Sequence, residues 1–291
     1  MSKVLAISGG VDSMLMMQIL PEFEDCVVAH FNHGTRPSAD ADEAFVRAWA
    51  EQLGLPFYCG RAELGENVSE AVAREKRYAF LNEVTEEVGG VLVTAHHLND
   101  LAETVAINFL RGTGWRGLAP FSNEQVLRFY IDNGKTKKDV LKMAAERGVV
   151  FRQDPTNTQD NYLRNRVREK TAELSETCLA EIHQLYVAQN KLRGEIDGLV
   201  QAVIEGLETV GDGDGKKYWR KWFFDGGLLG GAENEAVALE ILRAGLIRAG
   251  VSATRPQILD FLTAVRTYAP SKKFNLPGGK MVTLYKDYFV L

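Results

Sequence analysis

The chain has 291 residues, of which 45% are hydrophobic and 25% are charged, with a formal net charge of -5. This composition is typical of a globular protein with one large or two modest domains, and it argues against a uniformly basic nucleic-acid-binding surface. No apolar stretch approaches the roughly 18 residues that span a bilayer, so we expect no membrane partner and a cytoplasmic location.

The first half of the chain alternates short apolar runs with amphipathic helical patterns. Strands are predicted at 3–7, 26–31, 55–60 and 91–96, each followed by a helix, with Gly54 as a C-cap and with Asn67 and Glu70 as a capping box. This alternation predicts an α/β fold, a doubly wound parallel sheet in which ligands bind at the carboxyl ends of the strands. The polar sequences "SGG", "HFNHG" and "AHHLND" end three of these runs, so we expect the functional site at that edge.

The pattern changes after about residue 174. A long helical pattern from Glu181 to about Val210 leads to "GDGDG" at 211–215. Two helical segments and a strand pair around "LPGGK" follow. We therefore predict a first domain over 1–174 and a second, mostly helical domain over 175–291.

The first strand-to-helix turn holds the sequence "SGGVDS", formed by Ser8, Gly9, Gly10, Val11, Asp12 and Ser13. Glycines at such a turn let backbone amides approach a phosphate, and the N-terminus of the following helix adds partial positive charge. The turn is therefore predicted to cradle an anion. A tight turn that only packs a strand against a helix is the alternative, but it would need no hydroxyl or carboxylate groups.

Other candidate motifs are weaker. "GTGWRG" at 112–117 satisfies the G-x-G-x-x-G spacing but follows a helix instead of a strand, and "NGKT" at 133–136 lacks the upstream glycine of a P-loop. The cysteines Cys26, Cys59 and Cys178 are widely spaced and form no C-x-x-C pair. They indicate neither a disulfide framework nor a metal cluster.

The loop "SGGVDS" resembles the signature of the PP-loop ATP pyrophosphatases, which split ATP between the α and β phosphates. In chain order, "HFNHGTRPSADADEAFVRAWAEQLGLPFY", "EAVAREKRYAFL", "TAHHLNDLAETVAINFLRGTGWRGLAPF" and "DPTNTQDNYLRNRVRE" are similar to the tRNA(Ile)-lysidine synthetase family within that superfamily. The similarity runs from Ser8 to about Glu169, and "LPGGKMVTLYKDY" resembles that family's substrate-binding domain.

The resemblance implies a PP-loop ATPase fold and an ATP-dependent carbon-nitrogen ligase. Such an enzyme adenylates the C2 oxygen of the wobble cytidine in a tRNA(Ile) with a CAU anticodon, and the ε-amine of L-lysine then displaces AMP. ATP would bind at the SGGVDS loop, and Mg²⁺ would be held by Asp12 and Asp100 at the strand ends. The structural alternatives are a helix N-cap for Asp12 and a first-turn carboxylate for Asp100.

Most of the histidines fall in two strand-end motifs, as His30, His33, His96 and His97. His30 and His96 are interpreted as hydrogen-bonded groups that end strands. His33 follows a strand beside Asn32, so we predict that it contacts nucleotide or base and takes part in catalysis. A zinc site is an alternative, but no third ligand type occurs at a metal-binding spacing.

A basic segment is hidden by the net negative charge. From Arg128 to Lys170 the chain has 11 Lys and Arg residues against 6 Asp and Glu residues. The residues predicted to contact tRNA are Arg111, Arg116, Arg128, Arg164, Asn165, Arg166 and Arg168. A solvated helix surface is the alternative for the last three arginines. "KKYWRKWFF" interleaves cations with aromatic rings that either stack on bases or pack in the core.

The chain departs from the family pattern at several positions. Asn99 stands where relatives have the first aspartate of "HHxDDQxET", and Leu101 replaces the glutamine. Arg128 keeps the arginine of "RPLL", but the proline is lost. The chain has one appended domain and so resembles the short form of the family. A catalytically impaired tRNA-binding relative and another PP-loop tRNA-modifying enzyme are the alternative functions, and a homodimer is an open alternative to a monomer.

Overall fold

The computed structural model describes residues 1–34, 39–62, 70–121, 125–152, 162–210, 217–225 and 234–291. The chain divides into two compact units, Met1–Asn190 and Lys191–Leu291. The domain boundary predicted at residues 174 and 175 stays a prediction. Asn67, expected in a capping box, and the sequence "GDGDG" at 211–215 lie outside the described residues.

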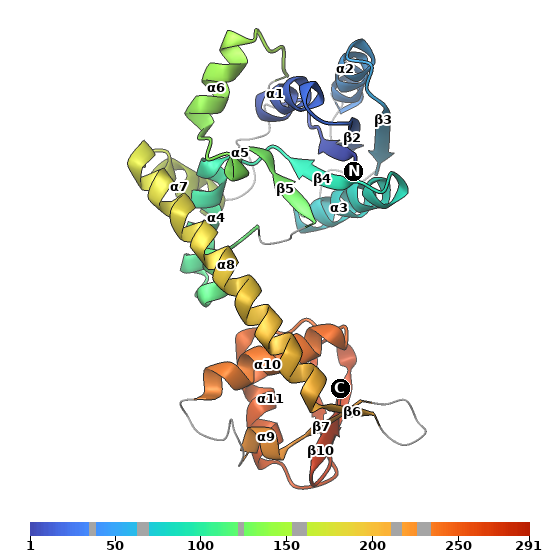
Figure 1. The fold of residues 1–291 in the computed structure, drawn as a ribbon, viewed down its shortest axis with the longest axis vertical. Helices are drawn as coiled ribbons and strands as arrows, with labels where there is room; N and C mark the ends of the chain where they lie inside the picture. The colour runs from blue at the N-terminus through green and yellow to red at the C-terminus, as the bar shows by residue number, and fades with distance from the viewer. Residues whose placement is uncertain (35–38, 63–69, 122–124, 153–161, 211–216, 226–233) are drawn as a thin grey trace. The chain divides into compact units, whose positions relative to one another are not determined.

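Within the described residues, the first unit is built on a parallel sheet of five strands (Figure 1). The strands are β1 (Lys3–Ala6), β2 (Cys26–Asn32), β3 (Phe57–Arg61), β4 (Val91–Thr94) and β5 (Val126–Arg128), in the order β3-β2-β1-β4-β5. The chain builds the sheet outward from β1 in one direction and from β4 in the other. A topological switch point therefore lies between the carboxyl ends of β1 and β4, and the predicted doubly wound α/β fold is confirmed.

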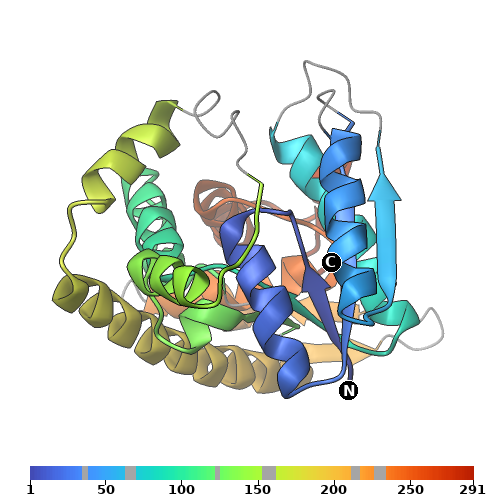
Figure 2. The same ribbon diagram turned by 90° about the horizontal axis from the view of Figure 1, so that it is seen from above.

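Helices cover both faces of this sheet (Figure 1 and Figure 2). The helices before residue 175 are α1 (Val11–Ile19), α2 (Ala39–Gln52), α3 (Glu70–Glu87), α4 (Leu98–Leu110), α5 (Phe129–Asp132), α6 (Lys137–Glu146) and α7 (Tyr162–Thr171), with short 3₁₀ turns at Leu20–Glu22 and Trp115–Leu118. Leu5 and Val28 pack with α1, α2 and α6 on one face, whereas Val4 and Val27 pack with α3 on the other. Because both faces are covered, consecutive residues such as Val4 and Leu5 or Val27 and Val28 are all buried, without the alternation of a half-exposed sheet.

The second unit combines helices with an antiparallel sheet. Its described strands are β6 (Glu208–Val210), β7 (Lys217–Arg220), β8 (Lys272–Asn275), β9 (Met281–Leu284) and β10 (Tyr288–Val290). Its described helices are the end of α8 (Glu176–Leu207), α9 (Trp222–Asp225), α10 (Glu235–Arg248) and α11 (Arg255–Thr267), with a 3₁₀ turn at Pro277–Gly279. The strand pair predicted around "LPGGK" is β8 and β9. The other strands were not predicted, because three or four residues are too few to show an alternating pattern.

The core of the second unit shows how "KKYWRKWFF" is used. Trp219 is 1% exposed and Phe224 is fully buried, and the ring centroids of Trp219 and Phe289 lie 6.0 Å apart. Trp222 is half exposed. Core packing therefore accounts for Trp219 and Phe224.

No helix in the described part of the chain is long and apolar enough to cross a membrane.

A buried carboxylate ties the ends of β2 and β3 to α2. Oε2 of Glu43 accepts a hydrogen bond from Nδ2 of Asn32 at 3.1 Å and lies 2.7 Å from Arg61, and Oε1 accepts one from Arg47 at 3.1 Å. Burial by itself raises the pKa of Glu43, but hydrogen bonds from Asn32, Cys59 and Arg47 outweigh it. Together with the charge of Arg61 they lower the pKa of Glu43 to about 2.

We expect this network to make stability depend on pH in the acid range. Because folding lowers the pKa of Glu43 from 4.5 to about 2, its stabilisation is complete above the unfolded value and is lost as the pH falls through the folded value. Glu43→Gln should lower the free energy of unfolding by ~1–3 kcal/mol at neutral pH and flatten its acid dependence. Urea denaturation at several pH values measures both effects. Glu146→Gln, on the exposed face of α6, is the control. If the stability of Glu43→Gln depended on acid pH as strongly as that of the parent, the prediction would be contradicted.

A second prediction concerns Gly245, which is buried in α10. A methyl group at its Cα would lie 2.7 Å from Cζ2 of Trp219 and closer still to Cη2, and Trp219 has no free space in the core. Gly245→Ala should therefore lower the free energy of unfolding by ~1–3 kcal/mol. At Gly198 in α8 a methyl group meets no described atom within 4 Å, so Gly198→Ala should instead add ~0.5–1 kcal/mol through helix propensity. Chemical denaturation measures the free energy of unfolding of both variants. An equal increase in the two would show that the core accommodates a methyl group at Gly245 and would contradict the prediction.

Candidate nucleotide-binding site

The sequence "SGGVDS" forms the turn from β1 to α1. Gly9 has a φ of 91°, a conformation that residues with a side chain rarely adopt, and Gly10 is the N-cap of α1. Oγ of Ser13 donates to the carbonyl of Gly10 at 3.0 Å and accepts from the backbone N–H of Ser8 at 3.2 Å. These bonds hold the turn closed from within.

The N-terminus of α1 has no side-chain cap among the described residues. The first intrahelical bond runs from the N–H of Met14 to the carbonyl of Gly10, so the N–H groups of Val11, Asp12 and Ser13 have no acceptor within the helix. By contrast, α4 and α6 are closed by side-chain capping boxes. Open amides at the positive end of a helix dipole bind anions, so the geometry of this turn is that of the predicted phosphate cradle.

The carboxylate of Asp12 pairs with a lysine and does not cap α1. Its Oδ1 lies 2.6 Å from Nζ of Lys137, the first residue of α6, and the hydroxyl of Tyr130 donates to the carbonyl of Asp12 at 2.9 Å. Burial raises the pKa of Tyr130. Both side chains of the ion pair are about one third exposed. A cation is therefore held beside the open amides and within reach of solvent.

Sequence reasoning missed Lys137. Spacing excluded the preceding "NGKT" as a P-loop, and in the structure this segment is the turn before α6. The available signal was the start of the helix, where Thr136 and Asp139 form a capping box and Lys137 and Lys138 follow the cap. Because the helix dipole disfavours cations in the first turn, a lysine there indicates an acidic partner, which is Asp12.

Asn99 and Asp100 both make structural contacts at the start of α4. Oδ1 of Asn99 accepts a hydrogen bond from the backbone N–H of Lys137 at 2.8 Å. Oδ2 of Asp100 accepts one from the backbone N–H of His97 at 3.0 Å, and the N–H of Asp100 donates to Nδ1 of His97 at 3.3 Å. Asp100 is thus the first-turn carboxylate of the structural alternative, and Asn99 positions the residue that pairs with Asp12. Leu101 is fully buried, and it packs with residues of α5 and α8.

A metal ion would have few ligands at this edge. Among the described residues, no group of three or more His, Cys, Asp or Glu side chains could hold a metal ion. Asp12 and Asp100 lie on the helices after β1 and β4, which are paired strands. Mg²⁺ commonly uses one or two carboxylates plus water and phosphate oxygens, so two carboxylates are sufficient in number. Oδ1 of Asp12 is paired with Lys137, and Oδ2 of Asp100 accepts from the backbone N–H of His97. The metal-binding role of both stays a prediction.

The histidines of the two strand-end motifs have different surroundings. Nδ1 of His30 lies 2.8 Å from the carbonyl of Ile7, and Nδ1 of His96 lies 2.9 Å from Oγ1 of Thr94. Burial lowers the pKa of both rings, so both are neutral at pH 7. The prediction that His30 and His96 are hydrogen-bonded is confirmed, but His30 lies within β2 and His96 lies two residues after the end of β4. His33 is half-buried after β2, and its contact with nucleotide or base and its catalytic role stay predictions.

The arginines predicted on α7 divide by their surroundings. Nε of Arg168 lies 3.1 Å from Oε1 of Glu103, and Nε of Arg164 lies 3.9 Å from Oε2. Glu103 belongs to α4 and is 4% exposed, so these ion pairs fix α7 on α4. Arg166 is exposed on another face, and Asn165 is half-buried. Contact of these residues with tRNA stays a prediction.

The other predicted tRNA contacts also differ in exposure. Arg111 is exposed at the C-cap of α4, and the guanidinium of Arg116 lies 4.5 Å from the ring centroid of Trp115. Arg128 is 5% exposed and donates to Oγ1 of Thr94 at 2.8 Å. Unlike the other two, Arg128 lies in the interior at the end of β5, and its contact with tRNA stays a prediction.

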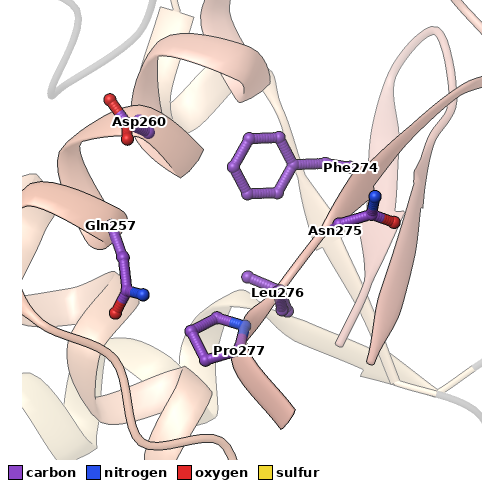
Figure 3. A pocket seen from close by; sticks show the side chains of 6 residues that line it. All are labelled: Gln257, Asp260, Phe274, Asn275, Leu276 and Pro277. Carbon is purple, nitrogen blue, oxygen red and sulfur yellow. The ribbon is translucent and has the colours of Figure 1, made fainter. Parts of the chain in front are cut away.

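The second unit has a cavity of about 270 Å³ between α11 and the segment where β8 ends and turns toward β9 (Figure 3). Its lining consists of Gln257, Asp260, Phe274, Asn275, Leu276 and Pro277. The lining includes one carboxylate and no cationic side chain. It is therefore chemically unsuited to hold phosphate groups, and it is separate from the cradle after β1.

Comparison with known proteins assigns the N-terminal part of the chain to a family. Residues 2–174 match a family described as the PP-loop domain. The tRNA(Ile)-lysidine synthase of Thermus thermophilus is 38% identical over 211 residues, which cover 69% of this chain and 41% of that protein. The enzyme of the same name from Streptococcus mutans is 38% identical over 177 residues, which cover 57% of this chain and 40% of that protein. The chain thus spans about two fifths of the length of these relatives.

Among solved structures, a U34-tRNA thiolase from Methanococcus maripaludis aligns with a TM-score of 0.55 and 19% identity, covering 66% of this chain and 72% of that chain. At this identity the likeness shows the fold alone. The match over residues 2–174 covers more than half of the chain and contains the open turn after β1. The chain therefore belongs to the PP-loop domain family and is similar to tRNA(Ile)-lysidine synthases.

Proposed function

We propose that the protein is an ATP-dependent ligase that joins L-lysine to C2 of the wobble cytidine in a tRNA(Ile) with a CAU anticodon. The observation that carries the proposal is the open N-terminus of α1 after Gly9, in a segment that matches the PP-loop domain. The 38% identity to the T. thermophilus tRNA(Ile)-lysidine synthase supports the choice of substrate. The reaction consumes ATP and releases AMP and pyrophosphate.

In the first step, the C2 oxygen of cytidine attacks the α-phosphate of ATP, and the bond between the α and β phosphates breaks. Negative charge builds up on the departing pyrophosphate. The open amides of α1 and the ammonium of Lys137 are placed to stabilise that charge without reorganisation. When bound, Mg²⁺ would neutralise further phosphate charge, with Asp12 and Asp100 as its ligands.

In the second step, the ε-amine of lysine attacks C2, the C2–O bond breaks and AMP leaves. The amine has an ordinary pKa near 10.4, so its deprotonation at neutral pH costs roughly 4–5 kcal/mol. A base at the strand ends would lower that cost. His33 is the proposed group, because it follows β2 at the carboxyl edge and is partly open to solvent.

The decisive experiment measures transfer of labelled lysine to tRNA transcripts. We expect incorporation into a transcript with a CAU anticodon, only when ATP is present, and none into a matched transcript with a GAU anticodon. ATP-independent tRNA binding without incorporation would favour the catalytically impaired relative. ATP consumption with tRNA but without lysine transfer would favour another PP-loop tRNA-modifying enzyme.

Asp12→Asn tests the phosphate site. The change removes the charge that holds Lys137 and the proposed metal ligand, and it leaves the turn of Gly9 and Gly10 unchanged. Lysine transfer should fall by about a hundredfold or more, while tRNA affinity stays close to that of the parent. Glu22→Gln is the control, because it removes one carboxylate from an exposed ion pair with Arg147. Unchanged lysine transfer by Asp12→Asn would contradict the proposed role of Asp12 at the phosphate site.

The arginines of α7 give a separate prediction for tRNA binding. Arg166→Ala should weaken tRNA binding and reduce the slope of log affinity against log salt by roughly 0.7–0.9, because one phosphate contact is lost. Arg168→Ala should mainly lower the free energy of unfolding, because it leaves the buried Glu103 with a weaker partner. Filter binding at several salt concentrations and thermal denaturation separate the two effects. Equal slopes for Arg166→Ala and the parent would assign Arg166 to a solvated surface.

A further inference from the structure

Arg74, Arg77 and Arg128 gather around Tyr78 in the first unit, and we call these four residues the arginine cluster. The guanidinium groups of Arg74 and Arg77, both on α3, lie 4.8 Å and 5.3 Å from the ring centroid of Tyr78. Arg74 also donates to the hydroxyl of Tyr78 at 3.3 Å. Arg128 is the last residue of β5, and its charge acts on the same hydroxyl, where it lowers the pKa of Tyr78. Cations from α3 and β5 thus converge at one hydroxyl.

These guanidinium groups lack an acidic partner within the described residues. There, no carboxylate lies within 4.0 Å of the guanidinium nitrogens of Arg74, Arg77 or Arg128. The Nε atoms of Arg77 and Arg128 are buried and have no hydrogen-bond partner among the described atoms. Arg128 as a whole is only 5% exposed. The nearby Asp132 accepts a bond from the backbone N–H of Arg128 at 2.8 Å. Buried cationic donors without acceptors are costly, which indicates that an anion completes the cluster.

The electrostatic surroundings agree with a missing negative charge. Burial, together with the charges of Arg74 and Arg128, lowers the pKa of Arg77. Burial and the same arginines hold the pKa of His96 well below its usual range, so His96 is neutral and its Nδ1 bonds with Thr94. Like charges this close repel one another unless an anion lies between them.

The arginine cluster is separate from the phosphate cradle. α3 packs on the opposite face of the sheet from α1 (Figure 1). Both sites lie at the carboxyl edge, because Arg128 ends β5, which pairs with β4 beside the switch point. The triphosphate already has the open amides of α1. A second anion site at the same edge therefore suits a second substrate.

We propose that the arginine cluster binds the α-carboxylate of the amino-acid substrate. The inference rests on the proposed function, in which the amino acid is the small substrate that carries a carboxylate. A guanidinium fork matches a planar carboxylate with two parallel hydrogen bonds, and the hydroxyl of Tyr78 adds a donor. Held there, the substrate presents its amine from the far end of its side chain. The cluster thus selects amino acids over simple amines.

The test compares L-lysine with cadaverine, which has the same amine but no carboxylate, as competitors for labelled lysine. In the parent protein, the inhibition constant of cadaverine should exceed the KM of lysine on the order of tenfold to a hundredfold. Arg77→Ala should raise the KM of lysine by a similar factor and leave the inhibition constant of cadaverine unchanged. Arg77→Lys keeps the charge without the fork, so it should recover only part of the loss. Arg147→Ala, in an exposed ion pair with Glu22, is the matched control and should change neither value.

The outcomes separate this proposal from its rivals. An increase in the KM of ATP without a change for lysine would assign the cluster to a nucleotide phosphate and overturn the proposal. Equal losses for lysine and cadaverine would assign the arginines to structure and also overturn it. ATP–pyrophosphate exchange without lysine checks that each variant is folded, and Arg74→Ala, at an exposed position, replaces Arg77→Ala if that variant does not fold. Failure of the parent to incorporate lysine would instead overturn the proposed function.

Discussion

The ion pair between Asp12 and Lys137 joins the first turn of α1 to the first turn of α6. Asn99 accepts a bond from the backbone N–H of the same lysine, so the start of α4 is tied to both. Helices that follow different strands are thereby fixed relative to one another at one edge of the sheet. The carboxylate of Asp12 and the ammonium of Lys137 are held beside the open amides of α1 by this arrangement. Two of the groups proposed to act on phosphate therefore depend on one side-chain contact between residues far apart in the chain.

The edge also concentrates positive charge in a protein with a net charge of -5. Lys137 and Arg128 lie near strand ends, and Arg128 is only 5% exposed, whereas carboxylates outnumber cations in the chain as a whole. Charges set in a low-dielectric wall act over longer distances than charges in water, so such an edge attracts anionic substrates while the remaining surface repels them. Localised charge of this kind explains why net charge alone is a poor guide to nucleotide or nucleic-acid binding.

Local sequence patterns were sufficient for the parts of the fold that are encoded locally. The apolar runs, the glycines at Gly9 and Gly10 and the helix end at Gly54 predicted the sheet, the turn after β1 and the end of α2. Contacts between distant segments were not readable in the same way. Lys137 meets Asp12 across 125 positions, and Arg128, predicted to contact tRNA, lies buried at the end of β5. Charge identifies a residue's chemistry, whereas only the fold decides its neighbours.

The open N-terminus of α1 links the stability of the fold to its ligand. A helix whose first amides lack acceptors is incomplete by itself, and a bound phosphate supplies the missing hydrogen bonds. Any ligand that binds only the folded state adds RT ln(1 + [L]/Kd) to the free energy of unfolding, about 2.7 kcal/mol at a hundredfold excess over Kd. The free energy of unfolding of the first unit then depends partly on the nucleotide concentration around it, so the folded fraction rises when nucleotide is abundant and falls when it is scarce.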